Sequence, residues 1–432
     1  MKLRAKRTIL IGFAFLSISA FWQMYDSIIP LILKYTFNLK ETPVGAIMAI
    51  DNVLALFLLP VFGVWSDRCN TRIGKRAPFI YIGTILSAGL LLLLHVQNRP
   101  GNLIPFIIVL FVLLLSMSFY RSPAVALMPD LTPPPLRSKG NAVINLMGAV
   151  GFIYALVMIK IFGGKAEECP SYLPLFLTIS GLMLISILIL AFFINENKLA
   201  KLVRSECAEA GISMDPVEEK SEDGQAAGRL SAPVRRSLVF LLCSVAFWYI
   251  AYNAVTTAFS RYATEMWSIG SDYADCLLIA SVAAVISYLP IGIISGKLGR
   301  KKVILAGVVI MALSYAALFF YTTYHVTAVL FFLLIGIGWA AINVNSLPMV
   351  VDMCSAGDIG RFTGYYYTFS MAAQVITPIA SGALLQYVSY RTLFPYSVCF
   401  MILAFITMSF VKHGDTKPLA KASLLEHFDA GD

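Results

Sequence analysis

Charge is scarce in this 432-residue sequence: only 13% of the residues are charged, and 59% are hydrophobic. A soluble domain carries about a quarter charged residues, so most of this surface must face something other than water. Apolar runs near or above about 18 residues, each long enough to cross a bilayer as a helix, recur along the whole chain. They are too long and too uniformly apolar for barrel strands, and in lipid every backbone group needs an internal partner. The sequence therefore predicts an all-α polytopic membrane protein.

Several chemical signatures are also missing. The seven cysteines are scattered without a CxxC pair, which argues against metal ligation and against a disulfide framework. The histidines fall at loop or tail positions, so none is placed in mid-membrane to relay protons: His95, His325, His413 and His427. The chain also lacks a nucleophile–histidine pair and a phosphate-binding glycine loop. We therefore expect neither an enzyme nor a bound metal or cofactor.

Hydropathy predicts twelve spans, with bounds good to within several residues. The opening MKLRAKR and the apolar run after it superficially resemble a signal peptide. However, the run is too long and no small-residue cleavage site closes it, so we expect a retained first span. The predicted spans are about 8–33, 42–63, 78–95, 103–127, 140–162, 172–194, 238–260, 274–295, 302–322, 326–350, 360–387 and 392–411.

The basic residues are unevenly distributed. The formal net charge is +9, and placing both termini in the cytoplasm puts 25 of the 33 Lys and Arg residues on that side. This asymmetry is the positive-inside pattern, and it predicts a protein of the inner or plasma membrane with cytoplasmic termini. Topology and attraction to anionic lipid headgroups then explain the bases, so no nucleic-acid partner is expected.

A polar stretch divides the chain into two halves. Residues 195–237 are charged and almost free of large apolar side chains, which predicts a flexible cytoplasmic linker. The expected parts are an N-terminal six-helix bundle (1–194), this linker, a C-terminal six-helix bundle (238–411) and a cytoplasmic tail (412–432).

Three pairs of matching segments indicate that the halves are repeats. AFWQMYDSIIPLILKY in the first span matches AFWYIAYNAVTTAFSRY in the seventh, with an offset of 227 positions between their equivalent tyrosines, and a base followed by tyrosine ends both. The loops after the second and eighth spans give an offset of 229, and the acids that end the fourth and tenth spans give 222. A nearly constant offset predicts two parallel repeats with a binding site between them, which is the design of an alternating-access transporter.

Charge is concentrated in one loop, GVWSDRCNTRIGKR, which runs from Gly63 to Arg76 between two apolar spans. Such a loop must hold the halves in register yet let them rock. We expect Asp67 to face a helix N-terminus of the other half and to pair with nearby bases. Gating, by contacts that form in one conformation and break in the other, is assigned to Asp67, Arg68, Lys75 and Arg76.

SDRCNTRIGKRAPFI in this loop resembles the signature of the major facilitator superfamily. In detail it is similar to the glycoside–pentoside–hexuronide:cation symporters and the sucrose–proton symporters. YRSPAVALMPDL (120–131), GIGWAAINVNSLPMVVD (336–352) and TGYYYTFSMAAQVITPIASG (363–382) resemble the same group. The resemblance covers nearly the whole chain, and it implies twelve helices in two pseudo-symmetric bundles and cation-driven uptake of a sugar or glycoside.

The sequence departs from that group at two places. Sodium-using members carry two carboxylates on the second span where this chain has Ala55 and Leu59, so the resemblance favours protons as the coupling ion. Those members also carry an acid in the fourth span where this chain has Arg121, which puts direct transfer of their sugar contacts in doubt.

Three ionisable groups fall inside predicted spans, namely Asp26, Asp51 and Arg121. Each costs about 2.5–3.5 kcal/mol at a helix centre, which is tolerable when the groups face a cavity or one another. Burial raises the pKa of a carboxyl group and a neighbouring guanidinium lowers it, so a carboxylate that alternates between such surroundings loads and releases a proton. We expect Asp26 to be the main protonatable group and Arg121 its partner or a sugar ligand. Asp51 is a second candidate, which could instead cap or brace neighbouring helices.

Sugar binding requires paired hydrogen-bonding groups and flat apolar faces. Amides and indole rings inside the predicted spans supply both, although helix packing uses the same residue types. The candidates are Trp22, Asn145, Asn253, Trp339, Asn343, Asn345 and Gln374.

We therefore expect a proton-coupled importer of a sugar or glycoside that works in the bilayer as a monomer. A proton-driven exporter of drugs or amphiphiles stays open as an alternative. Such antiporters usually carry a Gly-Pro pair in the fifth span, whereas GNAVINLMGAVGF (140–152) has no proline. A non-transporting sensor with the same fold is the third reading, and substrate-dependent proton flux separates it from a transporter.

Overall fold

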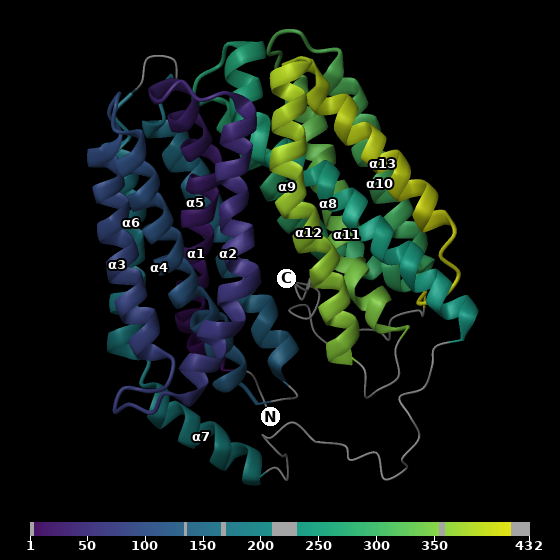
Figure 1. Ribbon diagram of the computed structural model, residues 1–432. Helices are drawn as coiled ribbons and strands as arrows, with labels where there is room; N and C mark the ends of the chain where they lie inside the picture. Colours follow the sequence, from purple (N-terminus) through teal and green to yellow (C-terminus); the bar gives the residue numbers. More distant parts are fainter. Residues whose placement is uncertain (1–3, 134–135, 166–169, 210–230, 354–358, 416–432) are drawn as a thin grey trace.

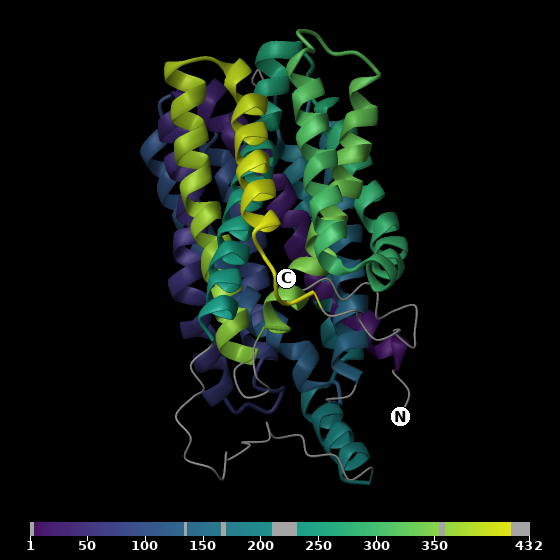
Figure 2. The same cartoon turned by 90° about the vertical axis from the view of Figure 1, so that its right-hand side faces the viewer.

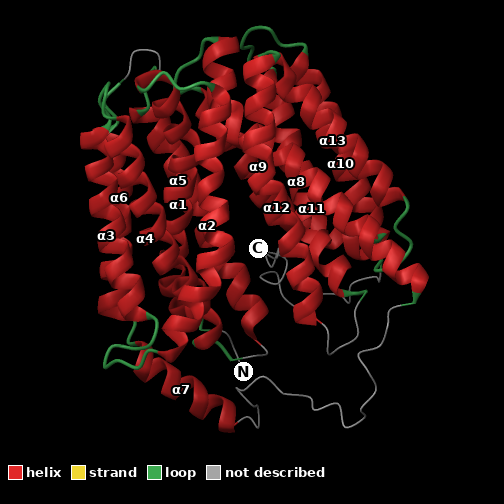
Figure 3. Cartoon of the chain, viewed as in Figure 1, coloured by secondary structure: helices red, strands yellow, loops and turns green. Residues whose placement is uncertain are grey.

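The computed structural model describes residues 4–133, 136–165, 170–209, 231–353 and 359–415 (Figure 1). Over these residues the chain is built from helices joined by loops (Figure 3). Among them, twelve helices are long and apolar enough to cross a membrane, and they coincide with the twelve spans predicted from the sequence. The all-α prediction is confirmed.

Six spanning helices form the N-terminal bundle. Helices α1, α2 and α4 contain internal prolines, which spanning helices tolerate because neighbouring helices and local adjustments satisfy the freed backbone groups. The bounds are α1 (Ala5–Leu31) with its π-helical extension η1 (Ile32–Thr36), α2 (Glu41–Arg68), α3 (Ala77–Gln97), α4 (Leu103–Asp130), α5 (Arg137–Phe162) and α6 (Leu173–Phe193).

Six further spanning helices form the C-terminal bundle. Helix α8 begins somewhat earlier than predicted, with a proline in its first turn, where the missing N–H has no helical partner to lose. The bounds are α8 (Ala232–Trp267), α9 (Tyr273–Leu298), α10 (Arg300–Phe319), α11 (Ala328–Val351), α12 (Ile359–Tyr387) and α13 (Leu393–Ser409), with a 3-10 turn, η5 (Tyr390–Thr392), before α13.

The first part of the predicted flexible linker is helical. Helix α7 (Glu196–Glu209) buries Val203 and Cys207, and Leu199 packs partly against the core. These three residues are spaced four apart, so they form an apolar stripe along one helix face. That stripe is the physical reason why this segment folds despite its charged composition. Residues 210–230 of the predicted linker and the tail from 416 lie outside the described residues, and the last residues of the linker belong to α8, which begins at Ala232.

The two bundles stand side by side (Figures 1 and 2). In Figure 1 they converge at the top and diverge toward the bottom, where α7 and the start of α1 lie. We call the bottom the α7 side and the top the far side. The most extensive contacts between the bundles join α2 to α12, α5 to α9 and α1 to α8.

The sequence repeat has a counterpart in the side-chain contacts. Ser66 Oγ donates to the carbonyl oxygen of Gly63 at 2.8 Å, and Ser295 Oγ donates to that of Gly292 at 2.9 Å, at the offset of 229 found in the sequence. At the same end of each bundle an arginine pairs with the acid near the end of the fourth helix of its half, in Arg76–Asp130 and Arg300–Asp352. The two halves are therefore structural repeats.

Candidate functional site: a cavity between two bundles

A cavity of about 250 Å³, here called the large cavity, lies between the bundles about midway along their helices. Helices α1 and α5 line it from the N-terminal half, and α8, α9 and α11 line it from the C-terminal half. Its polar lining includes Ser19, Asn145, Tyr252, Ser281, Tyr288 and Asn343. A site built by both repeats changes shape whenever the repeats move relative to each other.

A second cavity of about 170 Å³, the small cavity, adjoins the first and shares part of its wall. Asp26 and Gln23 of α1 line it from one half, and Asn253 and Thr256 of α8 from the other. Because these residues are further along α1 and α8 than the lining of the large cavity, the small cavity is the one nearer the far side. Gln23, which the sequence reasoning missed, donates to Ser27 Oγ at 2.8 Å. Its spacing of three residues from Asp26 was the signal that could have found it.

Two aromatic rings form part of the wall that the cavities share. The rings of Tyr252 and Trp339 are stacked with centroids 3.8 Å apart and planes inclined by 4°. Tyr249 meets the Trp339 ring edge-on at 5.4 Å, which fixes its orientation. The pair therefore offers a rigid flat face close to polar groups, the combination that a sugar ring requires.

The three predicted membrane charges lie within electrostatic range of one another. Asp26 and Asp51 repel each other, and Arg121 attracts both. Arg121 lies over the ring of Trp22, with 5.5 Å between the guanidinium carbon and the ring centroid. Asp51 accepts a hydrogen bond from Asn52 at 2.8 Å. Asp26 lines the small cavity, whereas Asp51, Arg121 and Trp22 are absent from the lining of both cavities.

The predicted amides divide into two groups. Asn145, Asn253 and Asn343 line the cavities, and Asn343 Oδ1 is buried without a hydrogen-bond partner among the described residues, so a ligand can use it. The other two lie outside the lining of both cavities and bond to their own helices. Asn345 donates to the carbonyl oxygen of Ala341 at 2.8 Å and is 1% exposed, and Gln374 donates to that of Ser370 at 3.4 Å.

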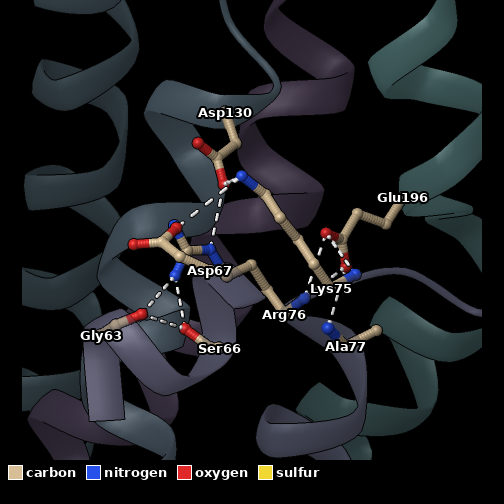
Figure 4. A network of polar contacts seen from close by, with 8 residues as sticks. All are labelled: Gly63, Ser66, Asp67, Lys75, Arg76, Ala77, Asp130 and Glu196. Carbon is tan, nitrogen blue, oxygen red and sulfur yellow. Dashed lines mark hydrogen bonds and ion pairs between the residues drawn. The ribbon is translucent and has the colours of Figure 1, made fainter. Parts of the chain in front are cut away.

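The predicted gating loop forms a network within the N-terminal half (Figure 4). Arg76 pairs with Asp67 and, at 3.0 Å, with Asp130, while Lys75 reaches Asp130 at 2.9 Å. The described ion-pair partners of Asp67 are Lys75 and Arg76 of its own half, as expected for the pairing with nearby bases. Its contact with a helix N-terminus of the other half concerns the conformation in which the bundles meet on this side, and it stays a prediction. Arg68 is exposed.

A carboxylate from α7 completes this network. Glu196 accepts hydrogen bonds from the backbone N–H groups of Lys75, Arg76 and Ala77 at 2.9–3.1 Å, at the N-terminus of α3. These groups lack partners within the helix, and the helix dipole favours an anion there. Glu196 therefore fastens α7 to the gating loop (Figure 4).

A charged cluster that the sequence reasoning missed joins the bundles on the far side. Glu41 pairs with Arg261 at 2.7 Å, and Lys34 pairs with Glu265 at 2.6 Å and with Glu41 at 3.2 Å. Tyr390 donates its phenolic hydrogen to Glu41. We call Lys34, Glu41, Arg261, Glu265 and Tyr390 the far-side cluster. Its sequence signal was the base that ends each matching repeat segment.

The described part of the chain shows no evident metal-binding site. No group of three or more His, Cys, Asp or Glu side chains with metal-binding geometry occurs there.

Comparisons with known proteins place the chain in a family. The family model of the Major Facilitator Superfamily matches residues 11–273 and 270–426, which together cover nearly the whole chain. Among solved structures, the nucleoside transporter NupG superimposes with a TM-score of 0.66 at 17% identity, covering 95% of this chain and 100% of that one. A POT family transporter in complex with 5-aminolevulinic acid gives 0.68 at 12% identity, covering 93% of this chain and 95% of that one. At these sequence identities the superpositions show a shared fold and nothing about function.

Curated relatives match over shorter segments. The Sucrose transport protein SUC3 of Arabidopsis thaliana is 29% identical over 120 residues, 23% of this chain and 20% of that protein. The Proton-associated sugar transporter A of Homo sapiens is 28% identical over 134 residues, 28% of this chain and 18% of that protein. The Lactose permease of Lactobacillus helveticus is 26% identical over 310 residues, 64% of this chain and 44% of that protein. The matches thus span between about a fifth and less than half of these relatives.

Both the fold and the family place the chain in a lipid bilayer. Large apolar side chains are exposed on several spanning helices, among them Ile104, Phe192 and Leu313, as expected where lipid replaces water. The chain is an integral membrane protein and belongs to the Major Facilitator Superfamily.

Proposed function

We propose that the chain is a secondary active transporter that couples uptake of a sugar or glycoside to protons by alternating access. The observation that carries the proposal is the position of Asp26. It is the ionisable carboxylate that lines the small cavity, beside the stacked pair of Tyr252 and Trp339 and the amide of Asn253. An ionisable side chain within a spanning helix is expensive, so a functional role is the first hypothesis for it.

The chemistry follows from these neighbours. The aromatic pair takes the apolar face of a pyranose, while Asn253, Asn343 and Asn145 exchange hydrogen bonds with its hydroxyl groups. A carboxyl group changes its proton affinity when a cavity exchanges water for closed protein. Asp26 thus takes up a proton on one side of the membrane and releases it on the other. Arg121 and Asp51 tune the field around it without lining the cavities.

Two further lines support the substrate and the direction. The names of the relatives mention sucrose, lactose and proton-associated sugar transport. The distribution of Lys and Arg favours a cytoplasmic location for the α7 side, with both termini there. In that orientation the present conformation has its bundles apart on the cytoplasmic side and joined on the outer side (Figure 1).

The test is a flux assay with the purified chain in proteoliposomes. A pH-sensitive dye inside the vesicles reports proton movement while a panel of mono- and disaccharides is added outside. We expect one class of sugar to drive proton entry, and Asp26→Asn to abolish the proton signal while the protein stays folded. Proton flux driven only by amphiphiles leaving the vesicle favours the exporter. Absence of flux with every sugar contradicts the proposal, and proton-coupled uptake that is unchanged in Asp26→Asn removes this residue from the mechanism.

A further inference from the structure

One tyrosine reaches the small cavity from a helix that otherwise does not line it. Tyr315 lies on α10, which packs mainly against α11 and α13 and supplies no other described residue to the lining of either cavity. In Figure 1, α10 and α13 lie on the side of the C-terminal bundle that is turned away from the N-terminal bundle. The remaining walls of the small cavity come from α1, α5, α8, α9 and α11. Because the backbone of α10 lies outside this ring of helices, the phenol end of Tyr315 is the part nearest the cavity.

Packing fixes the position of this side chain. The ring of Tyr315 stacks on that of Phe394 in α13, with 6.4 Å between the centroids and planes inclined by 26°. Glycines bring α10 close to α11, since a Cβ atom added at Gly307 would lie 2.7 Å from the carbonyl oxygen of Gly338. Tyr315 follows Gly307 by eight residues, so both lie on about the same face of α10. The close approach of the two helices therefore directs Tyr315 past α11 toward the cavity.

The hydroxyl group of Tyr315 has no partner within the described part of the chain. The residue is 0% exposed, and its hydroxyl oxygen is buried without a hydrogen bond to any described residue. A buried hydroxyl group that stays unsatisfied costs free energy, and protein, water or ligand satisfies most such groups in native structures. A phenylalanine would fill the same space without this cost. The position of the hydroxyl group at the cavity wall therefore indicates that its partner comes from the cavity.

The other polar groups of the small cavity are rich in acceptors. Asp26 supplies a carboxylate, and Gln23 and Asn253 supply amide oxygens, while each of these amides uses a hydrogen in a bond to another part of the protein. Tyr252, in the shared wall, lies within electrostatic range of both Asp26 and Tyr315. A phenol both donates and accepts hydrogen bonds. Tyr315 thus adds a donor to a cavity whose other groups mainly accept.

We infer that Tyr315 is a substrate-binding residue, whose hydroxyl group donates a hydrogen bond to a hydroxyl group of the sugar in the small cavity. The inference rests on the proposed function, because it takes the solute to be a sugar. A pyranose carries adjacent hydroxyl groups that each donate and accept, so one of them accepts from Tyr315 while it or its neighbour donates to Asp26. Tyr315 then selects sugars by the presence of one particular hydroxyl group.

The test compares sugar binding by the unaltered chain and by Tyr315→Phe, which removes the hydroxyl group and keeps the ring. The probes are sucrose, lactose, maltose and glucose, and isothermal titration calorimetry on the purified full chain measures their binding. We expect Tyr315→Phe to weaken the tightest-binding probe by about 2- to 12-fold, the range for one neutral hydrogen bond. Without sugar, the variant should melt at the same temperature as the unaltered chain or higher, because the lost hydroxyl group bonded to no described residue.

Deoxy sugars show whether the contact is direct. Monodeoxy forms of the tightest-binding probe, each lacking one hydroxyl group, are titrated against both chains. We expect one of them to bind the unaltered chain more weakly than the parent sugar does, and this difference should shrink in Tyr315→Phe, where the bond is already missing. Tyr273→Phe is the matched control and should bind every probe normally, since this buried phenol on α9 lies outside the lining of both cavities.

Three outcomes overturn this inference alone, in a chain that binds a probe sugar. They are equal affinity of Tyr315→Phe and the unaltered chain, a penalty for each missing hydroxyl group that is the same in both chains, and a sugar-free Tyr315→Phe that melts well below Tyr273→Phe or does not fold. Failure of the proposed function looks different. If no probe binds the unaltered chain, the sugar is wrong and both proposals fall. If binding depends on Tyr315 but moves no protons, the contact stands and the coupling falls.

Discussion

The α2–α12 contact offers a way to force the far side open without touching a charge. A Cβ atom added at Gly45 of α2 would lie 2.0 Å from the carbonyl oxygen of Pro378 in α12. Ordinary contact begins at 3.4 Å, and under 3.0 Å something must shift. The added Cβ is fixed by the backbone of α2 and meets a backbone oxygen of α12, so no side-chain rotamer can relieve the clash. The Gly45→Ala substitution therefore requires α2 and α12 to separate by about an ångström at this point.

The magnitude follows from the cost of overpacking. Inserting a methyl group into a tight contact typically costs about 1–3 kcal/mol. Because the two helices belong to different halves, a conformation with the far side open avoids this cost. The equilibrium should therefore move toward the far-side-open form by about 5- to 150-fold. Gly382→Ala acts across the same contact from the other half, since its Cβ would lie 2.7 Å from the carbonyl oxygen of Glu41.

The assay is thiol labelling from the far side. A cysteine in place of Thr256, which lines the small cavity, reacts with a membrane-impermeant maleimide only when the far side opens. Gly181→Ala is the matched control, because its Cβ meets nothing within 4 Å and it changes helix propensity equally. We expect faster labelling in Gly45→Ala and Gly382→Ala than in this control. A folded Gly45→Ala chain that labels no faster refutes the view that this contact closes the far side.

Two further predictions concern the cavity wall and the α7 side. Trp339→Leu removes the ring stacked on Tyr252, so the apparent affinity for the sugar should fall by about 2- to 12-fold with little change in thermal stability, measured by uptake titration and by melting. Glu196→Gln weakens the cap on three backbone N–H groups of α3, so the free energy of unfolding should fall by about 0.5–2 kcal/mol, whereas the exposed Glu209→Gln should change it little. If Trp339→Leu leaves the apparent affinity for the sugar unchanged, the stacked pair is not part of the binding site. If Glu196→Gln and Glu209→Gln melt at the same temperature, the Glu196 cap does not contribute to the stability of the fold.

The fold was accessible from the sequence because its signals are local. Each span is a continuous apolar run, and the repeat is a constant offset between short motifs. Helix α7 was not predicted from the sequence, because this segment was judged by its charged average composition. The average does not reveal the apolar stripe formed by Leu199, Val203 and Cys207. Counting residue types over a segment loses the spacing that makes one face of it apolar.

The site was predictable only as far as helix faces can be read. Asn343 and Asn345 were proposed together, but residues two apart on a helix point about 200° from each other. Asn343 lines the large cavity with Trp339, four residues earlier, whereas Asn345 bonds to its own helix. The rotation of α11 about its axis decides whether Asn343 or Asn345 points toward the other half. That rotation cannot be derived from a single sequence.

The ion pairs are of two kinds, those within one half and those between the halves. Arg76 of the gating loop pairs with Asp130 at the end of α4 in one half, and the equivalent pair of Arg300 and Asp352 lies in the other. Contacts inside a unit that was duplicated appear twice, and they travel with their bundle when the bundles rock. Contacts across the axis, such as Glu41–Arg261, occur once and must break if the bundles separate on the far side. The repeated networks are therefore expected to keep each bundle rigid. The unrepeated ion pairs between the bundles, which among the described residues include Glu41–Arg261 and Lys160–Asp275, are expected to set which conformation the two rigid bundles adopt.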